Sequence, residues 1–96
     1  MSRDSIRKLK ALAFPEPLLD ASAIGKRIAS ARRGRKWRQV DLARLIGVKR
    51  LTVSNYEGGW RIPERDTLVK LSLCLHRSLD WLVVGRARGA SRKWLT

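Results

Sequence analysis

The fold is decided by residues 39–59, Gln39-Val-Asp-Leu-Ala-Arg-Leu-Ile-Gly-Val-Lys-Arg-Leu-Thr-Val-Ser-Asn-Tyr-Glu-Gly-Gly59, which describe two short helices joined by a glycine turn. Apolar residues recur at helical spacing on both sides of Gly47, and Gly47 interrupts both patterns. Because it has no Cβ, Gly47 can adopt the positive φ that ends a helix, and Val48 can fold back onto the preceding turn. The residues expected to be buried are Leu42, Ala43 and Ile46 in the first helix, and Val53 and Tyr56 in the second.

Three further helices are expected around this pair, so the sequence predicts an all-α fold. The five expected ranges are about 22–33, 39–46, 50–57, 64–75 and 79–84. Ser22 and Ser78 are the expected N-caps of the first and last helices, and Gly34 and Gly85 their expected ends. Outside the central pair, helical spacing predicts a buried stripe at Ile24, Ile28 and Ala31 and another at Leu68, Leu71 and Leu75.

The periodic apolar residues predict one small domain at residues 22–85 of the 96. Residues 1–21 form an N-terminal arm, for which a short helix and a disordered segment both fit, because so short a helix is marginal alone in water. Residues 86–96 form a basic C-terminal tail with little apolar surface to bury.

The composition favours a polyanionic partner. The formal net charge is +14, and a protein that neutralises phosphates gains from the release of condensed counterions. Ribosomal and membrane-surface proteins can be equally basic, so charge alone does not identify the partner. Cys74 is the sole cysteine and His76 the sole histidine, so we expect no disulfide, metal site or cofactor. Because no apolar run approaches the roughly 20 residues of a membrane span, a cytoplasmic protein is expected.

With these elements in place, the sequence resembles the Cro and phage-repressor class of helix-turn-helix regulators, also called the Xre family, over about residues 24–85. The resemblance implies a five-helix, lambda-repressor-like DNA-binding domain whose second and third helices form the helix-turn-helix. The shared positions are Ile28, Gln39, Leu42, Ala43, Gly47, Val48, Val53, Ser54, Tyr56, Glu57, Gly59, Pro63, Leu68 and the run from Ser78 to Gly85.

By position, the resemblance implies that the second motif helix lies in the major groove of double-stranded DNA while the first spans the backbone. The expected base contacts are Arg50, Leu51, Thr52, Ser54 and Asn55. Side-chain chemistry agrees, because Arg50 can donate two hydrogen bonds to guanine and Asn55 can pair with adenine or contact a phosphate. Either Leu51 or the methyl group of Thr52 can meet a thymine methyl.

Phosphate contacts are expected at the starts of the motif helices. Gln39 matches the family's glutamine at the start of the first motif helix, where the helix N-terminus also favours an anion. The other candidates lie at or beside the ends of elements and are Arg38, Lys49, Arg61 and Arg65.

The sequence departs from the family at two kinds of position. Arg38 and Lys49 stand where the family usually has Ser or Thr as N-caps, and neither can accept a backbone N–H bond. Trp60 stands where the family often has a basic or small residue, and it could stack near the DNA backbone or pack beneath its loop. Glu57, at the end of the second motif helix, is expected to pair with an arginine of the domain, for instance Arg44 or Arg33, and so to fix the helix.

A single domain of this kind makes few base contacts, so we expect a homodimer on a palindromic operator. The expected dimer interface is the last helix, with Leu79, Trp81, Leu82 and Val83. The leading hypothesis is therefore a sequence-specific transcriptional regulator that acts as a repressor.

Two other functions stay open at this point. One is an antitoxin that represses its own operon and binds a toxin through the apolar Ile6, Leu9 and Leu12 of the arm. The other is a nonspecific nucleic-acid-binding protein, which would show no sequence preference at high salt. An enzyme is not expected, because no nucleophile has a base at a spacing that a small helical domain could bring together.

Overall fold

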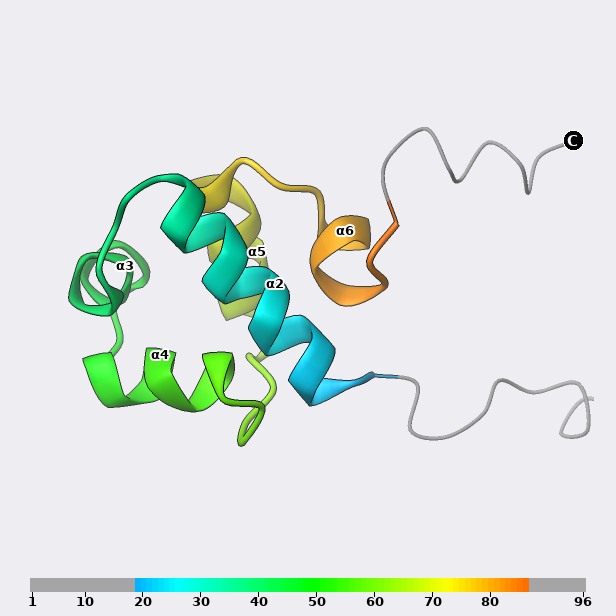
Figure 1. Cartoon of the computed structure of the whole chain (residues 1–96), viewed down its shortest axis with the longest axis horizontal. Helices are drawn as coiled ribbons and strands as arrows, with labels where there is room; N and C mark the ends of the chain where they lie inside the picture. The colour runs from blue at the N-terminus through cyan, green and yellow to red at the C-terminus, as the bar shows by residue number, and fades with distance from the viewer. Residues whose placement is uncertain (1–18, 87–96) are drawn as a thin grey trace, which may run out of the picture.

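The structure, a computed structural model, describes residues 19–86, which form five helices and no strand (Figure 1). The helices are α2 (Ala21–Gly34), α3 (Gln39–Ile46), α4 (Arg50–Glu57), α5 (Arg65–Leu75) and α6 (Leu79–Val83). The all-α, five-helix prediction is confirmed, and each helix lies within one residue of its predicted bounds at either end. The predicted arm and tail, apart from residues 19–21 and Arg86, lie outside the described residues.

Helix α2 runs through the middle of the fold and contacts α4, α5 and α6 (Figure 1). Its N-cap is Asp20 and not the predicted Ser22, because the Asp20 carboxylate accepts a hydrogen bond of 3.2 Å from the Ala23 backbone N–H. A charged acceptor at this position also suits the positive end of the helix dipole. The helix therefore begins one residue earlier than its sequence pattern predicts.

The turn between α3 and α4 has the predicted geometry. Gly47 has φ 73°, in the left-handed region that favours glycine. The N–H of Val48 donates to the Ala43 carbonyl at 2.9 Å, and the Val48 side chain packs against the core. This tight closure positions α4 across α3 and sends its exposed face outward.

The core is one apolar cluster to which all five helices contribute. Fully burying a side chain of this kind contributes about 1.5–3 kcal/mol relative to leaving it exposed. Leu68, predicted to be buried, is only partly so, because it lies at an open groove between α5 and α6. The cluster is Ile24, Ile28, Ala31, Leu42, Ala43, Ile46, Val53, Tyr56, Leu71, Leu75 and Leu82.

Helices α2 and α4 are packed tightly at Gly25, a residue that the sequence analysis did not single out. A Cβ at Gly25 would press against the carbonyl oxygen of Tyr56 and lie 2.7 Å from that of Glu57. These are backbone atoms at the C-terminal end of α4, which can move only if the helix moves. Only glycine therefore allows the two helices to pack at this distance.

Helix α6 is short and is held by contacts at both ends. The Ser78 hydroxyl accepts from the Trp81 N–H at 3.1 Å, as predicted for its N-cap. Arg27 of α2 donates to the Leu82 and Val83 carbonyls at 3.1 and 3.3 Å, which satisfies carbonyls at the helix end. Within residues 19–86, none of the helices has the length and apolar character needed to cross a membrane.

Candidate nucleic-acid interface

The candidate interface is centred on the exposed face of α4. Val53 and Tyr56 are buried, so they fix the rotation of this helix about its axis. The opposite side carries the residues predicted to contact bases. Arg50 and Leu51 are exposed, with 61% of Leu51 accessible to solvent. The other three predicted residues, Thr52, Ser54 and Asn55, are half-buried on the same helix.

A buried ion pair joins the C-terminal ends of α2 and α4. Arg32 Nε and Nη2 donate to the two carboxylate oxygens of Glu57 at 2.7 and 3.0 Å, and Arg32 Nη1 donates to the Trp37 carbonyl at 2.7 Å. Only 10% of the Arg32 side chain and 6% of the Glu57 side chain are exposed. Hydrogen bonding to Glu57 raises the pKa of Arg32, although burial opposes the shift. The pair locks α4 onto α2.

The prediction that Glu57 pairs with an arginine of the domain is confirmed, but its partner is Arg32 and neither of the two arginines given as examples, Arg44 and Arg33. The sequence contains a signal for this choice. Arg32 continues the i, i+4 spacing of Ile24 and Ile28, so it lies on the buried stripe of α2 and faces α4. Arg33 lies one residue further around the helix and is exposed.

Hydrogen bonds continue from this ion pair to the first residue of α4. Gln39 Nε2 donates to Glu57 Oε1 at 3.0 Å, and Gln39 Oε1 accepts from Arg50 Nη1 at 3.2 Å. The carboxylate can only accept, so it fixes which end of the Gln39 amide faces Arg50. The buried pair thereby orients an exposed arginine at the N-terminus of α4.

The N-termini of α3 and α4 lack side-chain caps from their own N-cap residues, Arg38 and Lys49. At α3 the loss is partly compensated by Asp41, whose carboxylate accepts from the Arg38 backbone N–H at 2.8 Å and from the Arg38 guanidinium at 3.3 Å. The pKa of Asp41 lies below its ordinary value of 3.8. The main cause is the hydrogen bond from the Arg38 side chain, and the second is the hydrogen bond from the Arg38 backbone N–H. Within residues 19–86, no carboxylate compensates in this way at Lys49.

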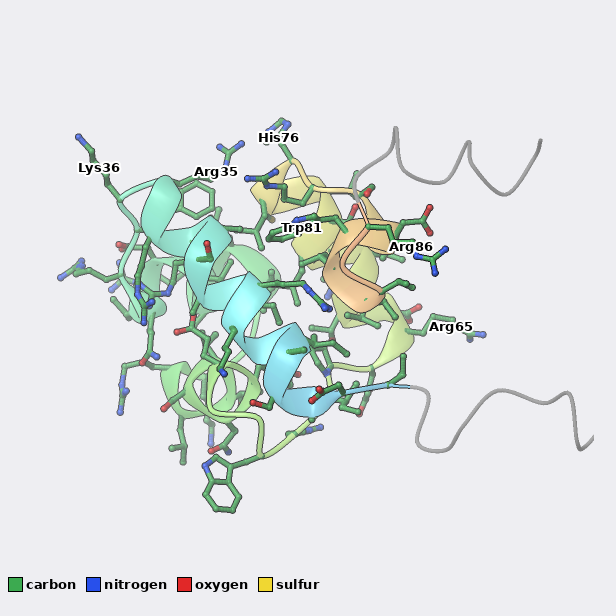
Figure 2. The ribbon with its side chains drawn as sticks, turned by 45° about the vertical axis from the view of Figure 1, so that its right-hand side comes forward. Arg35, Lys36, Arg65, His76, Trp81 and Arg86 are labelled. Carbon is green, nitrogen blue, oxygen red and sulfur yellow. The ribbon has the colours of Figure 1, made fainter. Side chains whose placement is uncertain are left out.

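The two remaining residues predicted to contact phosphates, Arg61 and Arg65, lie in two separate parts of the structure. Arg61, in the loop after α4, is paired with Glu64 at 3.2 Å and lies over the Tyr56 ring. Arg65 begins α5 and lines the groove beside α6, on the side of the molecule away from α3 and α4 (Figure 2). The structure thus gathers Arg38, Gln39, Lys49 and Arg50 at the starts of α3 and α4 but does not bring Arg65 to them.

Trp60 is 85% exposed, so the alternative in which it packs beneath its loop is excluded. Gly58 and Gly59 precede Trp60, and both are packed closely against other residues. Gly59 has φ 79° and lies against Ser22 at the start of α2. The indole therefore stands on a loop that is anchored to the domain.

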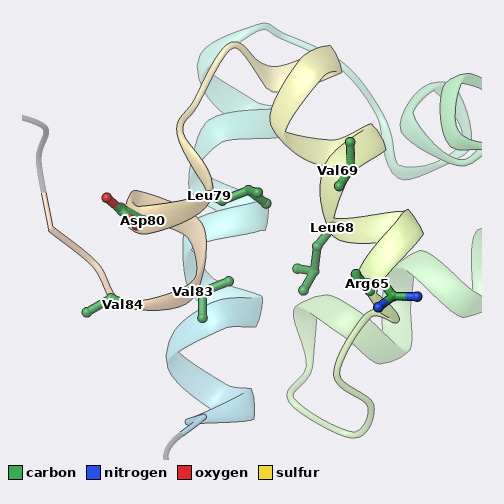
Figure 3. A pocket seen from close by; sticks show the side chains of 7 residues that line it. All are labelled: Arg65, Leu68, Val69, Leu79, Asp80, Val83 and Val84. Carbon is green, nitrogen blue, oxygen red and sulfur yellow. The ribbon is translucent and has the colours of Figure 1, made fainter.

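One of the four residues predicted for the dimer interface is not at the surface. Leu82 has no exposed surface, because it points into the core, so it cannot contact a second copy. Leu79 is exposed, and Trp81 and Val83 are half-buried. Leu79 and Val83 line a shallow groove between α5 and α6 (Figure 3). The residues around this groove are Arg65, Leu68, Val69, Leu79, Asp80, Val83 and Val84.

In the described part of the chain, histidine, cysteine and acidic side chains form no group of three that could hold a metal ion. Cys74 is half-buried beside the core, and His76 is exposed at the C-terminal end of α5 with φ 52°. Cys74 packs against the apolar cluster, and the His76 backbone N–H donates to the Ser72 carbonyl at the end of α5.

Comparison with known proteins gives consistent matches. A family model described as helix-turn-helix matches residues 28–82. The HTH-type transcriptional regulator ImmR of Bacillus subtilis is 36% identical over 61 residues, which is 64% of this chain and 48% of the relative. Multiprotein-bridging factor 1 of Candida glabrata is 36% identical over 75 residues, or 78% of this chain and 49% of the relative. The chain thus spans about half the length of these relatives.

Among solved structures, a crystal structure of the c2 repressor protein of phage P22 in complex with a synthetic operator is similar to this one. The two are 33% identical with a TM-score of 0.64, and the match covers 66% of this chain and 96% of that one. That repressor chain is therefore matched along nearly its whole length by the described helices.

Proposed function

Because the chain belongs to the helix-turn-helix family of the Cro and phage-repressor type, we propose that it binds double-stranded DNA and regulates transcription as a repressor. The observation that carries this proposal is the hydrogen-bonded connection from the buried ion pair of Arg32 and Glu57 through Gln39 to Arg50. It holds a multi-donor side chain at the exposed N-terminus of α4, before any ligand is bound. A fixed arginine at this position suits bidentate recognition of guanine in the major groove.

The base-reading surface is formed by α4. Arg50 contacts guanine, and the exposed Leu51 supplies an apolar surface for a thymine methyl. The half-buried Thr52, Ser54 and Asn55 contribute shorter polar contacts nearby. A base pair mismatched to one of these contacts is expected to weaken binding by about 1–3 kcal/mol.

Phosphate contacts flank this surface and set its register on the duplex. Gln39 and the N-terminus of α3 approach one phosphate, with Arg38 beside them, because an uncapped helix start presents backbone N–H groups to an anion. Lys49 contacts the backbone at the start of α4. Arg61 and Arg65 are weaker candidates, since Arg61 already has a carboxylate partner and Arg65 lies beside α6.

We further propose that the protein acts as a homodimer on a palindromic operator. The exposed apolar residues around the α5–α6 groove support this interface, in particular Val69, Leu79 and Val84. Half-sites about one helical turn apart, ~34 Å, are expected. Leu79→Asp should give a monomer in sedimentation, whereas Leu73→Asp, which changes an exposed leucine outside the groove, should leave the dimer intact.

The deciding experiment is selection of bound duplexes from a random DNA pool by the purified protein at moderate salt. We expect an inverted repeat, and Arg50→Ala should relax the preference at one base pair of each half-site. Lys70→Ala, which removes an exposed charge from α5, is the matched control and should leave the enriched sequence unchanged. Enrichment of a single half-site without an inverted repeat would contradict the proposed dimer. A pool without enrichment would favour a nonspecific nucleic-acid-binding protein.

The antitoxin alternative depends on Ile6, Leu9 and Leu12, which lie outside the described residues. Co-purification of a second, tightly bound chain would support it. The repressor proposal has the stronger support, because its DNA-binding surface lies within the described residues and because a phage repressor is among the similar structures.

A further inference from the structure

Trp60 is the most exposed of the large hydrophobic side chains in residues 19–86, at 85%. Within this part of the chain, its indole Nε1–H has no hydrogen-bond partner. An exposed indole contributes little to the folded state, because burying a large aromatic surface is what makes such a residue stabilising. The residue is therefore better explained by a ligand than by the fold.

The loop that carries Trp60 is held in place. Its backbone N–H donates to the Asn55 carbonyl at 2.9 Å, which ties it to the last turns of α4. A Cβ at Gly58 would lie 2.9 Å from indole Cδ1 and 3.3 Å from Nε1, so the ring rests directly on that glycine. The indole has a fixed base, and ordering it for a ligand requires little further loss of freedom.

The loop leaves the C-terminal end of α4 beside the start of α2, and its bend lies below α4 in Figure 1. Gly58, on which the indole rests, has helical backbone angles and follows the exposed Leu51 by seven residues, so two helical turns place both residues on the same side of α4. Trp60 therefore flanks the base-reading face of α4 at its C-terminal end.

The electrostatic surroundings indicate an anionic partner. Gly58, under the indole, also lines a polar concavity shared with Lys26, Arg33 and Gln39. The two nearest acids along the chain, Glu57 and Glu64, are each paired with an arginine. A ligand at Trp60 thus meets a surface on which cations outnumber unpaired carboxylates.

We propose that the Trp60 indole packs against the sugar–phosphate backbone of the duplex that α4 reads, with its face on a deoxyribose and Nε1–H donating to a phosphate oxygen. This inference rests on the proposed DNA-binding function and adds a contact to it. The deoxyribose ring is the apolar part of the backbone, and the indole combines an apolar face with one polar N–H. Because the indole carries no charge, this contact releases no counterion and persists when salt is raised.

The test is fluorescence anisotropy of a labelled mixed-sequence duplex, titrated with the full chain at several salt concentrations. Trp60→Ala should weaken binding about tenfold at every salt concentration, with an unchanged slope of log K against log salt. Trp60→Lys should restore affinity at low salt and steepen the slope by about 0.9, as one more phosphate contact does. Leu73→Ala, a control at another highly exposed apolar side chain, should leave affinity and slope unchanged.

Thermal unfolding separates this contact from a structural role, because loss of an exposed indole should leave the melting temperature within a degree or two of the parent. Wild-type affinity in Trp60→Ala, while Arg50→Ala still weakens binding, would overturn the Trp60 contact and leave the DNA-binding function standing. A change of oligomeric state in Trp60→Ala would overturn it in favour of a second copy. If the parent chain binds no duplex, the proposed DNA-binding function is refuted, and the Trp60 contact with it.

Discussion

The buried pair of Arg32 and Glu57 allows stability and DNA readout to be separated by mutation. Glu57→Gln keeps the size of the side chain but leaves the Arg32 guanidinium, only 10% exposed, without a counter-charge. Breaking one half of a buried pair typically costs about 3–5 kcal/mol, whereas a small domain has about 5–15 kcal/mol in all. Because glutamine still accepts one N–H, we expect a loss of about 3 kcal/mol for Glu57→Gln.

The double variant Arg32→Met with Glu57→Leu removes both charges and should recover most of that loss, to within about 2 kcal/mol of the parent. It also removes the acceptor that orients Gln39, so Arg50 loses its support. We therefore expect a folded protein whose preference for guanine at one position is reduced.

Urea denaturation followed by tryptophan fluorescence gives the stabilities, and selection from a random DNA pool gives the preference. Arg33→Met, at the exposed neighbouring arginine, is the control and should change the stability by no more than about 0.5 kcal/mol. Equal losses in Glu57→Gln and Arg33→Met would refute the energetic argument. A double variant with full guanine preference would refute the role of the pair in orienting Arg50.

Three further outcomes are expected. Gly25→Ala should destabilise the domain by about 1–3 kcal/mol in urea denaturation, because its Cβ would meet the carbonyls at the end of α4. Gly34→Ala, where a Cβ meets nothing within 4 Å, should instead stabilise by roughly 0.5–1 kcal/mol, and equal effects of the two changes would contradict this packing. Asp41→Asn should be less stable than the parent at neutral pH. The lowered pKa of Asp41 means that its contribution is present above 3.8 and is lost as the pH falls through the folded-state value, so the difference in urea midpoint should shrink in acid. Lys49→Ser should raise stability by about 1 kcal/mol by supplying a cap, yet weaken duplex binding in anisotropy, and tighter binding would count against a phosphate contact at Lys49.

The helices were predictable because their ends carry local signals. Gly47 ends α3 with a positive φ, and the Ser78 hydroxyl caps α6. Each signal acts within four residues of the chain, so no tertiary information was needed. At α2, both Asp20 and Ser22 can accept an N-cap hydrogen bond. The sequence pattern predicted Ser22, but the N-cap is Asp20.

Tertiary pairing was harder to predict, since it depends on the rotation of a helix about its axis. Leu82 and Val83 are adjacent apolar residues of α6, and only the packing against α2 and α5 decides which one enters the core. The choice of Arg32 over Arg33 is of the same kind, but the i, i+4 spacing from Ile28 already favoured Arg32. The same helical spacing could have predicted that Gly25 is buried against α4, because Gly25 lies on the same face of α2 as Ala29 and Arg32.

The positions at which the sequence departs from good helix design support the assignment of the functional face independently of any relative. The helices α2 and α6 have side-chain caps, and α5 has at least an acid, Glu64, at its N-cap. Of the five described helices, only α3 and α4 have a cation at the N-cap, Arg38 and Lys49, where a lost side-chain cap costs about 1 kcal/mol. The exposed Trp60 follows α4 directly. Residues that are unfavourable for the isolated fold thus gather at the starts of α3 and α4 and in the loop after α4, which is the pattern expected where a chain is selected for binding and not for stability.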